Sequence, residues 1–390
     1  MVGTGPRNRH ADLLAHAAAT RPLILISDTA PSWEQPYILD HARADRADLP
    51  SARRAAAALA RRHRIAGVLT FDDTGLALAA HLSTDLGLPG HSSATAAALQ
   101  DRGVARSVYD AAGLLAARVQ LADTAAGAVE AADLFGFPVL LRPANPRGDG
   151  AVHRADSPQQ VHDAFDTVGQ DTGSGFLVEE FVPGTELGVE CVTHYGVTTP
   201  VAITRTGPAS NPHRRIDASS VEAEDPLLAL VGPLAVVALD ALGVANAVTS
   251  VAMRISEDGR PHLVSVTGCL TAPRAWLVRH ATGIDLARAA ADLACGRTPD
   301  LAPTKRRAAA VQPIGAADAQ PLVLLPPDRR LADPAVLDSF LADMAADVTV
   351  VPVADETPSL QQLVAVGTTA AKCLSSLTEA AEALASEANR

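Results

Sequence analysis

The chain has 390 residues, of which 48% are hydrophobic and 19% are charged, and its formal net charge is −12. This length and composition can bury a substantial core, so we expect two or three compact units. The negative charge argues against a nucleic-acid partner, because polynucleotide binding depends on clustered lysine and arginine that neutralise phosphates. No apolar run approaches the roughly 20 residues that span a bilayer, and the N-terminus shows no secretory signal pattern. We therefore expect a cytoplasmic protein without membrane contact.

Residues 1–95 show strands alternating with helices. Two apolar runs of strand length, 22–27 and 65–71, precede or follow Ala-rich helical stretches at 51–64 and 74–86. This alternation predicts an α/β domain built on a parallel sheet. Asp28 and Asp72-Asp73 would then lie at the carboxyl ends of its strands, where such sheets bind ligands.

Residues 96–300 are predicted to form a larger α+β region. Turn and cap signals separate its elements, such as Gly136-Phe-Pro138 after one helix and the hairpin turn Ser256-Glu-Asp-Gly259 between two strands. The expected helices are 97–115, 125–135, 157–168, 226–242 and 284–295, and the expected strands are 139–142, 176–181, 187–194, 201–205, 247–255 and 262–266.

Residues 301–390 are predicted to form a small C-terminal α+β region after a proline-containing linker at 299–303. The expected strands are 309–314, 322–325 and 348–353, and the expected helices are 334–345 and 377–385. The four cysteines are far apart in the sequence and show neither zinc-site spacing nor a disulfide framework.

Four segments carry a resemblance to a known family. They are Phe137–Pro143, the loop Asn145–Gly150, the run Phe176–Glu186 and the late strand Leu263–Gly268. In order and spacing they resemble the ATP-grasp superfamily, specifically its carboxylate–amine ligase branch, which is similar to biotin carboxylase, over about residues 1–350. The resemblance implies a pre-ATP-grasp domain at 1–95 and an ATP-grasp domain at 96–300, with 96–182 as its smaller nucleotide-covering part and 183–300 as its larger part.

The resemblance also implies an ATP site. Arg102 and Arg142 stand where the family presents lysines to the nucleotide phosphates, and arginine keeps the charge with a different geometry. Gly148, Asp149 and Gly150 lie in the glycine-containing loop, whose backbone N–H groups suit phosphate oxygens. The remaining predicted contacts are Glu179, Glu180 and Val182 at the adenine hinge and Glu186 on the ribose. The residues alone leave open that Glu179 and Glu180 are only strand-end charges.

The metal positions of the family are changed. The family places Mg²⁺ carboxylates at positions that here hold Ala252, Ser265 and Thr267. Magnesium requires hard oxygen ligands, usually including carboxylate, so we expect no ordinary Mg²⁺ site. Glu190 on a neighbouring strand is the candidate for a relocated ligand.

A second charged group would handle the substrate. His213, Arg214 and Arg215 lie where the family binds its acceptor or carboxylate substrate, and Arg274 could join them. The alternative interpretation is a solvated loop without a ligand.

Two functions follow from the resemblance. The first is an ATP-dependent ligase that joins a small carboxylate to an amine through an acyl phosphate, with Arg274 in the reaction site. The second is a catalytically degenerate relative that binds a ligand or a protein partner without turnover. Because proteins of this branch often pair, a homodimer is expected by analogy.

Overall fold

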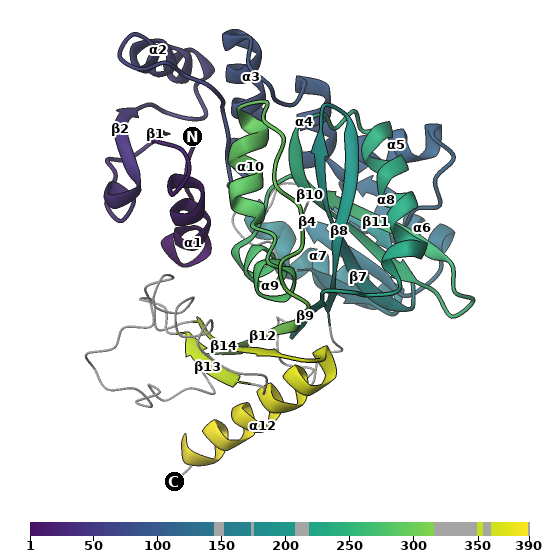
Figure 1. Cartoon of the computed structure of the whole chain (residues 1–390). Helices are drawn as coiled ribbons and strands as arrows, with labels where there is room; N and C mark the ends of the chain where they lie inside the picture. The colour runs from purple at the N-terminus through teal and green to yellow at the C-terminus, as the bar shows by residue number, and fades with distance from the viewer. Residues whose placement is uncertain (144–151, 173–174, 207–217, 316–348, 354–359, 389–390) are drawn as a thin grey trace. The chain divides into compact units, whose positions relative to one another are not determined.

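The computed structural model describes residues 1–143, 152–172, 175–206, 218–315, 349–353 and 360–388 (Figure 1). They divide into two compact units. Unit 1 comprises residues 1–96, 187–250 and 267–390, and unit 2 comprises residues 97–186 and 251–266. The domain boundaries expected from the sequence stay a prediction.

The N-terminal part of unit 1 contains a parallel pair of strands, β1 (Leu23–Ser27) and β2 (Ile38–Arg43). The predicted strand at 65–71 is wrong. Residues 65–71 form no regular ladder of hydrogen bonds with a neighbouring strand, although the Val2 amide donates to the Leu69 carbonyl. The sequence did not indicate β2, because Asp40, His41 and Arg43 give it a polar pattern. The helices of this part are α1 (Arg7–Ala18), α2 (Leu49–Ala60), α3 (Leu76–Leu86) and the first half of α4 (Ser93–Gln100), with 3₁₀ turns η1 (Gln35–Tyr37) and η2 (Asp73–Gly75).

The strands of the main sheet that lie wholly or mostly in unit 1, together with β10, follow the order β10-β7-β8-β9-β12-β14-β13. Its pairs from β7 to β13 are antiparallel. The strands are β7 (Thr185–His194), β8 (Val197–Thr206), β9 (Ser219–Glu222), β10 (Ala247–Ile255), β12 (Ala308–Gly315), β13 (Thr349–Val353) and β14 (Leu360–Gly367). The sequence predicted β7, β8, β10, β12 and β13, but not β9 or β14. The predicted elements at 322–325 and 334–345 lie outside the described residues.

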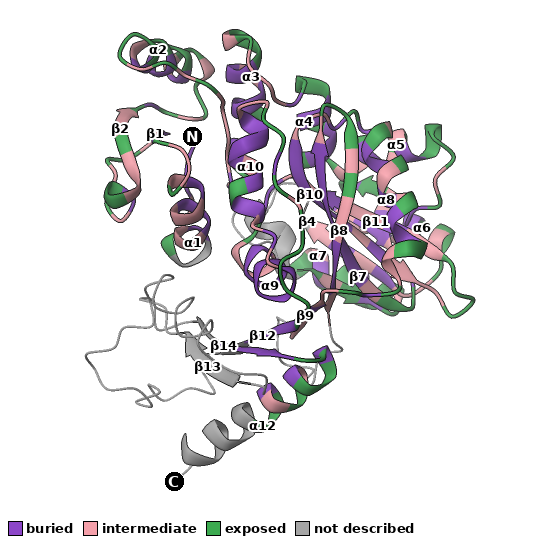
Figure 2. Ribbon diagram, in the orientation of Figure 1, coloured by how far each residue is buried: buried purple, intermediate pink, exposed green. Residues whose placement is uncertain are grey.

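Helices supply much of the core of unit 1. They are α8 (Leu228–Ala241), α9 (Ala272–Thr282), α10 (Leu286–Ala294) and α12 (Ala370–Ala388). The helices α9 and α10 are largely buried (Figure 2), and their Leu277 and Leu286 belong to one cluster with Leu13 of α1 and Leu25 of β1. Two of the helices, α1 and α9, were not predicted.

Unit 2 is built on a four-stranded antiparallel sheet with the order β3-β6-β4-β5. The strands are β3 (Val119–Ala122), β4 (Val139–Pro143), β5 (His153–Ala155) and β6 (Phe176–Glu180), and the helices are α5 (Arg102–Ala111), α6 (Ala125–Phe135) and α7 (Pro158–Thr172). Fully buried Leu141, Phe176 and Val178 form the core of this unit with α6 and α7. Unit 2 also contains residues 251–266, which comprise the end of β10, the predicted hairpin turn and β11 (Pro261–Thr267) as far as Val266.

Helix caps explain where the helices of unit 2 begin. Thr124 accepts a hydrogen bond from the Gly127 amide at the start of α6, whose predicted bounds are confirmed. The predicted helix at 97–115 is instead split, because Asp101 accepts from the Gly103 and Val104 amides and begins a new helix. This cap places Arg102 in the first turn of α5.

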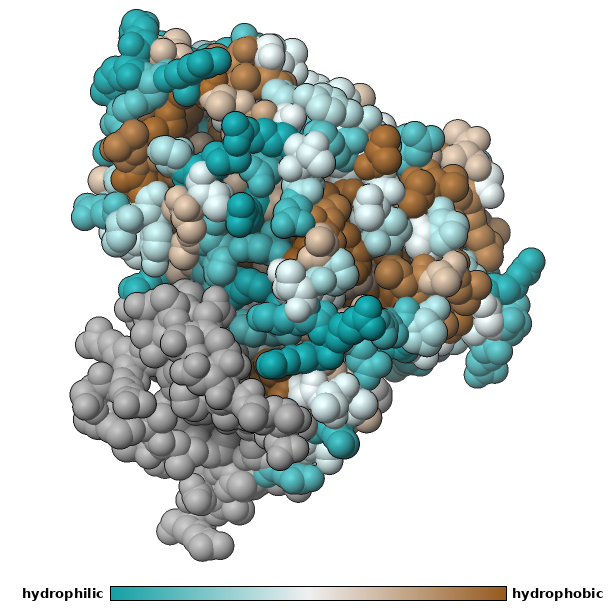
Figure 3. Space-filling model, in the orientation of Figure 1, coloured by the Kyte–Doolittle hydropathy of each residue, from teal (hydrophilic) through white to brown (hydrophobic). Residues whose placement is uncertain are grey.

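Within the described residues, no helix is long and apolar enough to cross a membrane. Exposed apolar side chains occur on α8, at Leu230 and Val237, and apolar areas are visible on the face drawn in Figure 3. Single exposures of this kind are ordinary on folded proteins.

Candidate functional site

A buried carboxylate in unit 2 forms ion pairs with both arginines that are predicted to contact phosphates. Glu179 is 3% exposed, and its Oε2 lies 2.9 Å from Nε of Arg142. Nη1 of Arg102 lies 3.1 Å from the other carboxylate oxygen, Oε1. Both arginine side chains are about one third exposed, at 31% and 30%. The cluster therefore combines a buried negative charge with two cations that reach the surface.

The strand register produces this cluster. Leu140 of β4 pairs with Glu179 of β6, and Arg142 lies two residues further along the same face of β4. Diagonal neighbours of this kind are within reach of long side chains. Arg102 completes the cluster from the capped first turn of α5. The antiparallel pairing of β4 with β6 thus brings Arg142 to Glu179, 37 positions away, and the cap of α5 brings Arg102 to Glu179, 77 positions away.

The electrostatics of the cluster are unbalanced. Burial lowers the pKa of Arg102, and the adjacent Arg142 guanidinium lowers it further against the opposing effect of Glu179. Oε1 of Glu179 is buried and has no aligned hydrogen-bond donor among the described residues, whereas Nη1 of Arg102 donates to Oε2 of the same carboxylate at 3.4 Å. An unsatisfied buried acceptor costs free energy unless a ligand or water completes it.

Glu180 points to the opposite face of β6 and has its own partner. The Arg118 guanidinium holds it at 3.0 Å, and the Arg118 backbone amide donates to it at 3.1 Å. Burial alone would raise the pKa of Glu180, but these hydrogen bonds lower it below its ordinary value. Arg118, which the sequence did not indicate, therefore fixes the strand end next to the predicted hinge.

Arg254 occupies the predicted nucleoside side of the hinge. Its Nη2 lies 2.5 Å from Oε2 of Glu186, and its Nη1 donates to the Val182 carbonyl at 3.2 Å. The same guanidinium lies over the Phe181 ring at 4.9 Å. A signal was present in the sequence, since Arg254 is two residues beyond Ala252 on the same strand, but its partner on another strand was not visible.

Several predicted residues cannot be placed. Gly148, Asp149 and Gly150 lie outside the described residues, and so do His213, Arg214 and Arg215.

Glu190 and Arg274 lie together in unit 1. Glu190 is 1% exposed and accepts hydrogen bonds from Thr204 at 2.9 Å and Ser250 at 3.0 Å, while Arg274 Nε lies 3.6 Å away. Burial raises the pKa of Glu190, although Arg274 and the two hydroxyls oppose that shift. Gly188 leaves room for this arrangement, because a Cβ there would lie 3.0 Å from the Ser250 hydroxyl.

The residues at the positions where the resemblance predicts metal ligands do not fit Mg²⁺. Ala252 has no ligand atom, and Ser265 and Thr267 offer only neutral hydroxyls. Glu190 is already saturated by an arginine and two hydroxyls. In the part of the chain that the structure describes, no group of three His, Cys, Asp or Glu side chains is placed to hold a metal.

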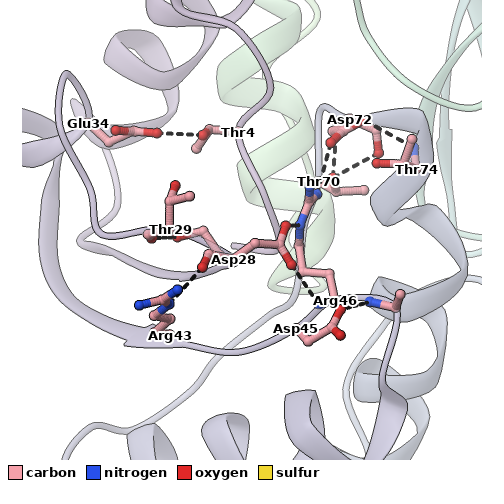
Figure 4. A network of polar contacts seen from close by, with 12 residues as sticks. Thr4, Asp28, Thr29, Glu34, Arg43, Asp45, Arg46, Thr70, Asp72 and Thr74 are labelled. Atoms are coloured by element: carbon pink, nitrogen blue, oxygen red, sulfur yellow. Dashed lines mark hydrogen bonds and ion pairs between the residues drawn. The ribbon is translucent and has the colours of Figure 1, made fainter. Parts of the chain in front are cut away.

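The predicted ligand-binding edge of the N-terminal part is a closed ion-pair network (Figure 4). Arg46 donates to Asp28 at 2.6 Å and to Asp72 at 2.9 Å, so one guanidinium bridges the two carboxylates. Thr74 adds a backbone donor to Asp72 at 3.1 Å. Gly3 permits the approach of Arg46, because a Cβ there would overlap its guanidinium.

Comparison with known proteins identifies the fold. No family model and no curated protein matches the chain. Among solved structures, the L-amino acid ligase from Bacillus licheniformis is 16% identical with a TM-score of 0.71 and coverage of 94% of this chain and 93% of that one. The N5-carboxyaminoimidazole synthetase from Staphylococcus aureus complexed with ADP is 10% identical with a TM-score of 0.72, covering 97% and 95%.

A third solved structure agrees with these two. The biotin carboxylase domain dimer of the Hydrogenobacter thermophilus 2-oxoglutarate carboxylase, with MgADP and bicarbonate, is 13% identical with a TM-score of 0.64, covering 91% and 83%. The chain therefore has the ATP-grasp fold, as the sequence resemblance implied. At these identities the likeness establishes the fold alone.

Proposed function

We propose that this protein is a carboxylate–amine ligase-like ATP-grasp protein that binds an adenine nucleotide on unit 2. The observation that supports the proposal is the cluster of Arg102, Arg142 and Glu179. Two partly exposed guanidiniums suit the oxygens of a phosphate chain.

The predicted hinge and ribose contacts support the same proposal. The Glu186 carboxylate is 44% exposed, so a ribose hydroxyl can reach it beside Arg254. The loop at 148–150 is proposed to cover the phosphates, as the resemblance implies.

In the ligase reaction, a substrate carboxylate oxygen would attack the γ-phosphorus of ATP and release ADP. An amine would then attack the acyl carbon of the acyl phosphate, and inorganic phosphate would leave with loss of an amine proton. His213, Arg214 and Arg215 are proposed to hold the substrate carboxylate. Arg274 can join them only if it leaves Glu190. The proposed substrates are a small carboxylate and an amine, and the protein is proposed to be a cytoplasmic homodimer.

The nucleotide site can be tested with matched arginine variants. Arg142→Gln removes one proposed phosphate contact, and Arg260→Gln removes an exposed arginine at the hairpin tip of the same unit. In calorimetric titrations with ADP, Arg142→Gln should weaken binding by about 10-fold or more, because a charge-assisted hydrogen bond contributes roughly 1.5–3 kcal/mol. Arg260→Gln should bind as the parent protein does. Equal affinities of all three proteins would refute the assignment of Arg142.

A second candidate function is ligand binding without turnover. It is favoured by the residues at the metal positions, since Ala252, Ser265 and Thr267 do not fit Mg²⁺. Losing preorganised charge stabilisation commonly costs several decades of rate. A screen for ADP formation with panels of carboxylates and amines separates the two functions, because only the ligase produces ADP that depends on both substrates.

Restoration of the metal ligands gives a further discriminating result. The triple variant Ala252→Glu, Ser265→Glu and Thr267→Asn should raise the affinity for MgATP if the nucleotide pocket is otherwise intact. An unchanged affinity would count against an intact pocket.

The oligomeric state can be measured directly. For a homodimer, light scattering after size-exclusion chromatography should give a molar mass of twice the 40.2 kDa of the chain. A mass of one chain at micromolar concentrations would contradict the dimer.

A further inference from the structure

Helix α8 (Figure 1) is apolar on its exposed side as well as on its buried side. The buried side packs against β8, where a Cβ on Gly232 would lie 3.3 Å from the ring of Pro200. The exposed positions of the helix are Ala229, Leu230, Pro233, Val237 and Asp240. Only the last of them is charged. A helix that is apolar all round is ordinarily buried on every side.

The exposed positions follow one stripe along α8. Steps of four and seven residues return to the same side of a helix, so Leu230, Pro233 and Val237 lie along one line. Leu230 is 50% exposed and Val237 is 49% exposed. Each is ordinary when taken singly, but contiguous apolar surface is where proteins bind partners. We call Ala229, Leu230, Pro233 and Val237 the α8 face.

The one charge beside the α8 face is unfavourably placed within its own chain. Asp240 lies in the last turn of α8, where the helix dipole has its negative end, and no basic residue occupies that turn. The first turn of the helix has the converse defect. Leu227 provides no side-chain cap there, and no acidic residue lies in that turn. A second helix packed antiparallel to α8 would correct both ends.

We propose that the α8 face is the contact surface of the homodimer, with the α8 helices of two copies packed antiparallel about a two-fold axis. This inference rests on the homodimer proposed above. The register that places Leu230 against the partner subunit's Val237 also places Val237 against the partner subunit's Leu230. Asp240 follows Val237 by three residues and Leu227 precedes Leu230 by three, so Asp240 reaches the positive end of the partner helix. The face is thus complementary to itself, as a two-fold interface requires.

The charges that precede α8 do not oppose this register. Glu224 is paired with Arg306 at 3.2 Å. Asp225 is paired with Arg205 at 2.6 Å. The whole chain carries a net charge of −12, so two copies repel each other over most of their surfaces. The α8 face avoids this repulsion, because its single neighbouring carboxylate meets a positive helix end.

Sedimentation equilibrium of the full-length protein over a range of concentrations measures the dimer. Helix α8 has 14 residues and is about 21 Å long, so its contact is smaller than a standard interface of about 800 Å² per partner, and the dimer should dissociate on dilution. Leu230→Glu should weaken dimerisation at least about 30-fold, which corresponds to about 2 kcal/mol for two symmetry-related leucines. Leu134→Glu makes the same change at an exposed position of α6 and should dimerise as the parent protein does.

The charge contact has a signature of its own. Asp240→Asn should weaken the dimer about threefold or more, because two charge–dipole contacts are lost. The melting temperature of the dilute monomer should not fall, since the carboxylate lies at the negative end of its own helix. A variant that destabilised the monomer and left the dimer unchanged would overturn the role of Asp240.

Cysteine cross-linking tests the antiparallel register. A mixture of the Leu230→Cys and Val237→Cys proteins should form more disulfide-linked dimer than either protein alone. In this register, like positions of the two helices are offset by seven residues, or about 10 Å along the axis. Equal cross-linking of the mixture and of each single variant would overturn the register.

The outcomes separate this surface from the rest of the proposed function. Leu230→Glu should bind ADP as the parent protein does, because α8 lies in unit 1 and the proposed nucleotide contacts lie in unit 2. A parent dimer that Leu230→Glu leaves intact would overturn the α8 face while the homodimer stands. A parent protein that is monomeric at every concentration would overturn both, and the ADP titration would still test the nucleotide site independently.

Discussion

The buried carboxylate of Glu179 offers a direct test of how the cluster in unit 2 is held together. Glu179→Gln keeps the shape and removes the negative charge that faces Arg102 and Arg142. Breaking a fully buried ion pair costs about 3–5 kcal/mol, and exposed pairs contribute about 0–1 kcal/mol. Glu179 is 3% exposed while its partners are about 30% exposed. We therefore expect an intermediate loss of about 2 kcal/mol in the stability of unit 2.

Glu186→Gln is the matched control. It is the same chemical change in the same unit, but Glu186 is 44% exposed and pairs with Arg254. Its loss should stay below about 1 kcal/mol, as for other exposed pairs.

Hydrogen exchange is the appropriate assay, because both tryptophans, Trp33 and Trp276, lie in unit 1 and do not report on unit 2. Peptides covering β4 and β6 should lose protection by roughly 30-fold in Glu179→Gln, the ratio that corresponds to about 2 kcal/mol. In Glu186→Gln the change should be less than about fivefold. Equal effects of the two substitutions would refute the link between burial and the strength of the cluster.

Three further predictions concern the two units separately. Burial alone would raise the pKa values of Asp28 and Asp72, but Arg46 lowers them below the ordinary aspartate value. Their contribution to stability is therefore present above the ordinary aspartate pKa and is lost as pH falls below it. Urea unfolding followed by Trp33 fluorescence should show a free energy of unfolding that declines from pH 5 to 3, Arg46→Gln should flatten this decline, and an unchanged decline would contradict this origin. Gly188→Ala should destabilise unit 1 by about 1–3 kcal/mol, because the added Cβ would crowd two oxygens at 3.0 and 3.2 Å, and a neutral thermal melt would show that they can move apart. Asp101→Ala removes the cap of α5 and should lower the protection of that helix in hydrogen exchange by about 0.5–2 kcal/mol, whereas full protection would mean that the cap contributes nothing.

Local signals predicted many elements of the fold. The end of helix α6 could be predicted from Gly136-Phe-Pro138, and the β10–β11 hairpin from its turn at 256–259. The segment at 65–71 shows the limit of such signals, since an apolar run of strand length does not reveal whether a neighbouring strand pairs with it. Strand β2 shows the converse, because its pairing with β1 is a tertiary property that its polar sequence hides.

The candidate site was predictable as a set of residues, but not as a set of pairs. The sequence indicated Arg102, Arg142 and Glu179 separately, and the strand register and the α5 cap bring them together. Arg254 was missed, because its importance lies in a contact with Glu186, which lies 68 positions away along the chain. Long-range ion pairs of this kind depend on sheet register, which a single sequence does not specify.

The most direct test of the central claim is calorimetric titration of the full-length protein with ATP and ADP, each with and without Mg²⁺. A nucleotide site that lacks fitted metal ligands predicts measurable binding of both nucleotides that Mg²⁺ does not strengthen. Absence of binding under all four conditions would contradict the nucleotide site. Binding that required Mg²⁺ would contradict the proposal that Ala252, Ser265 and Thr267 leave no site for the metal.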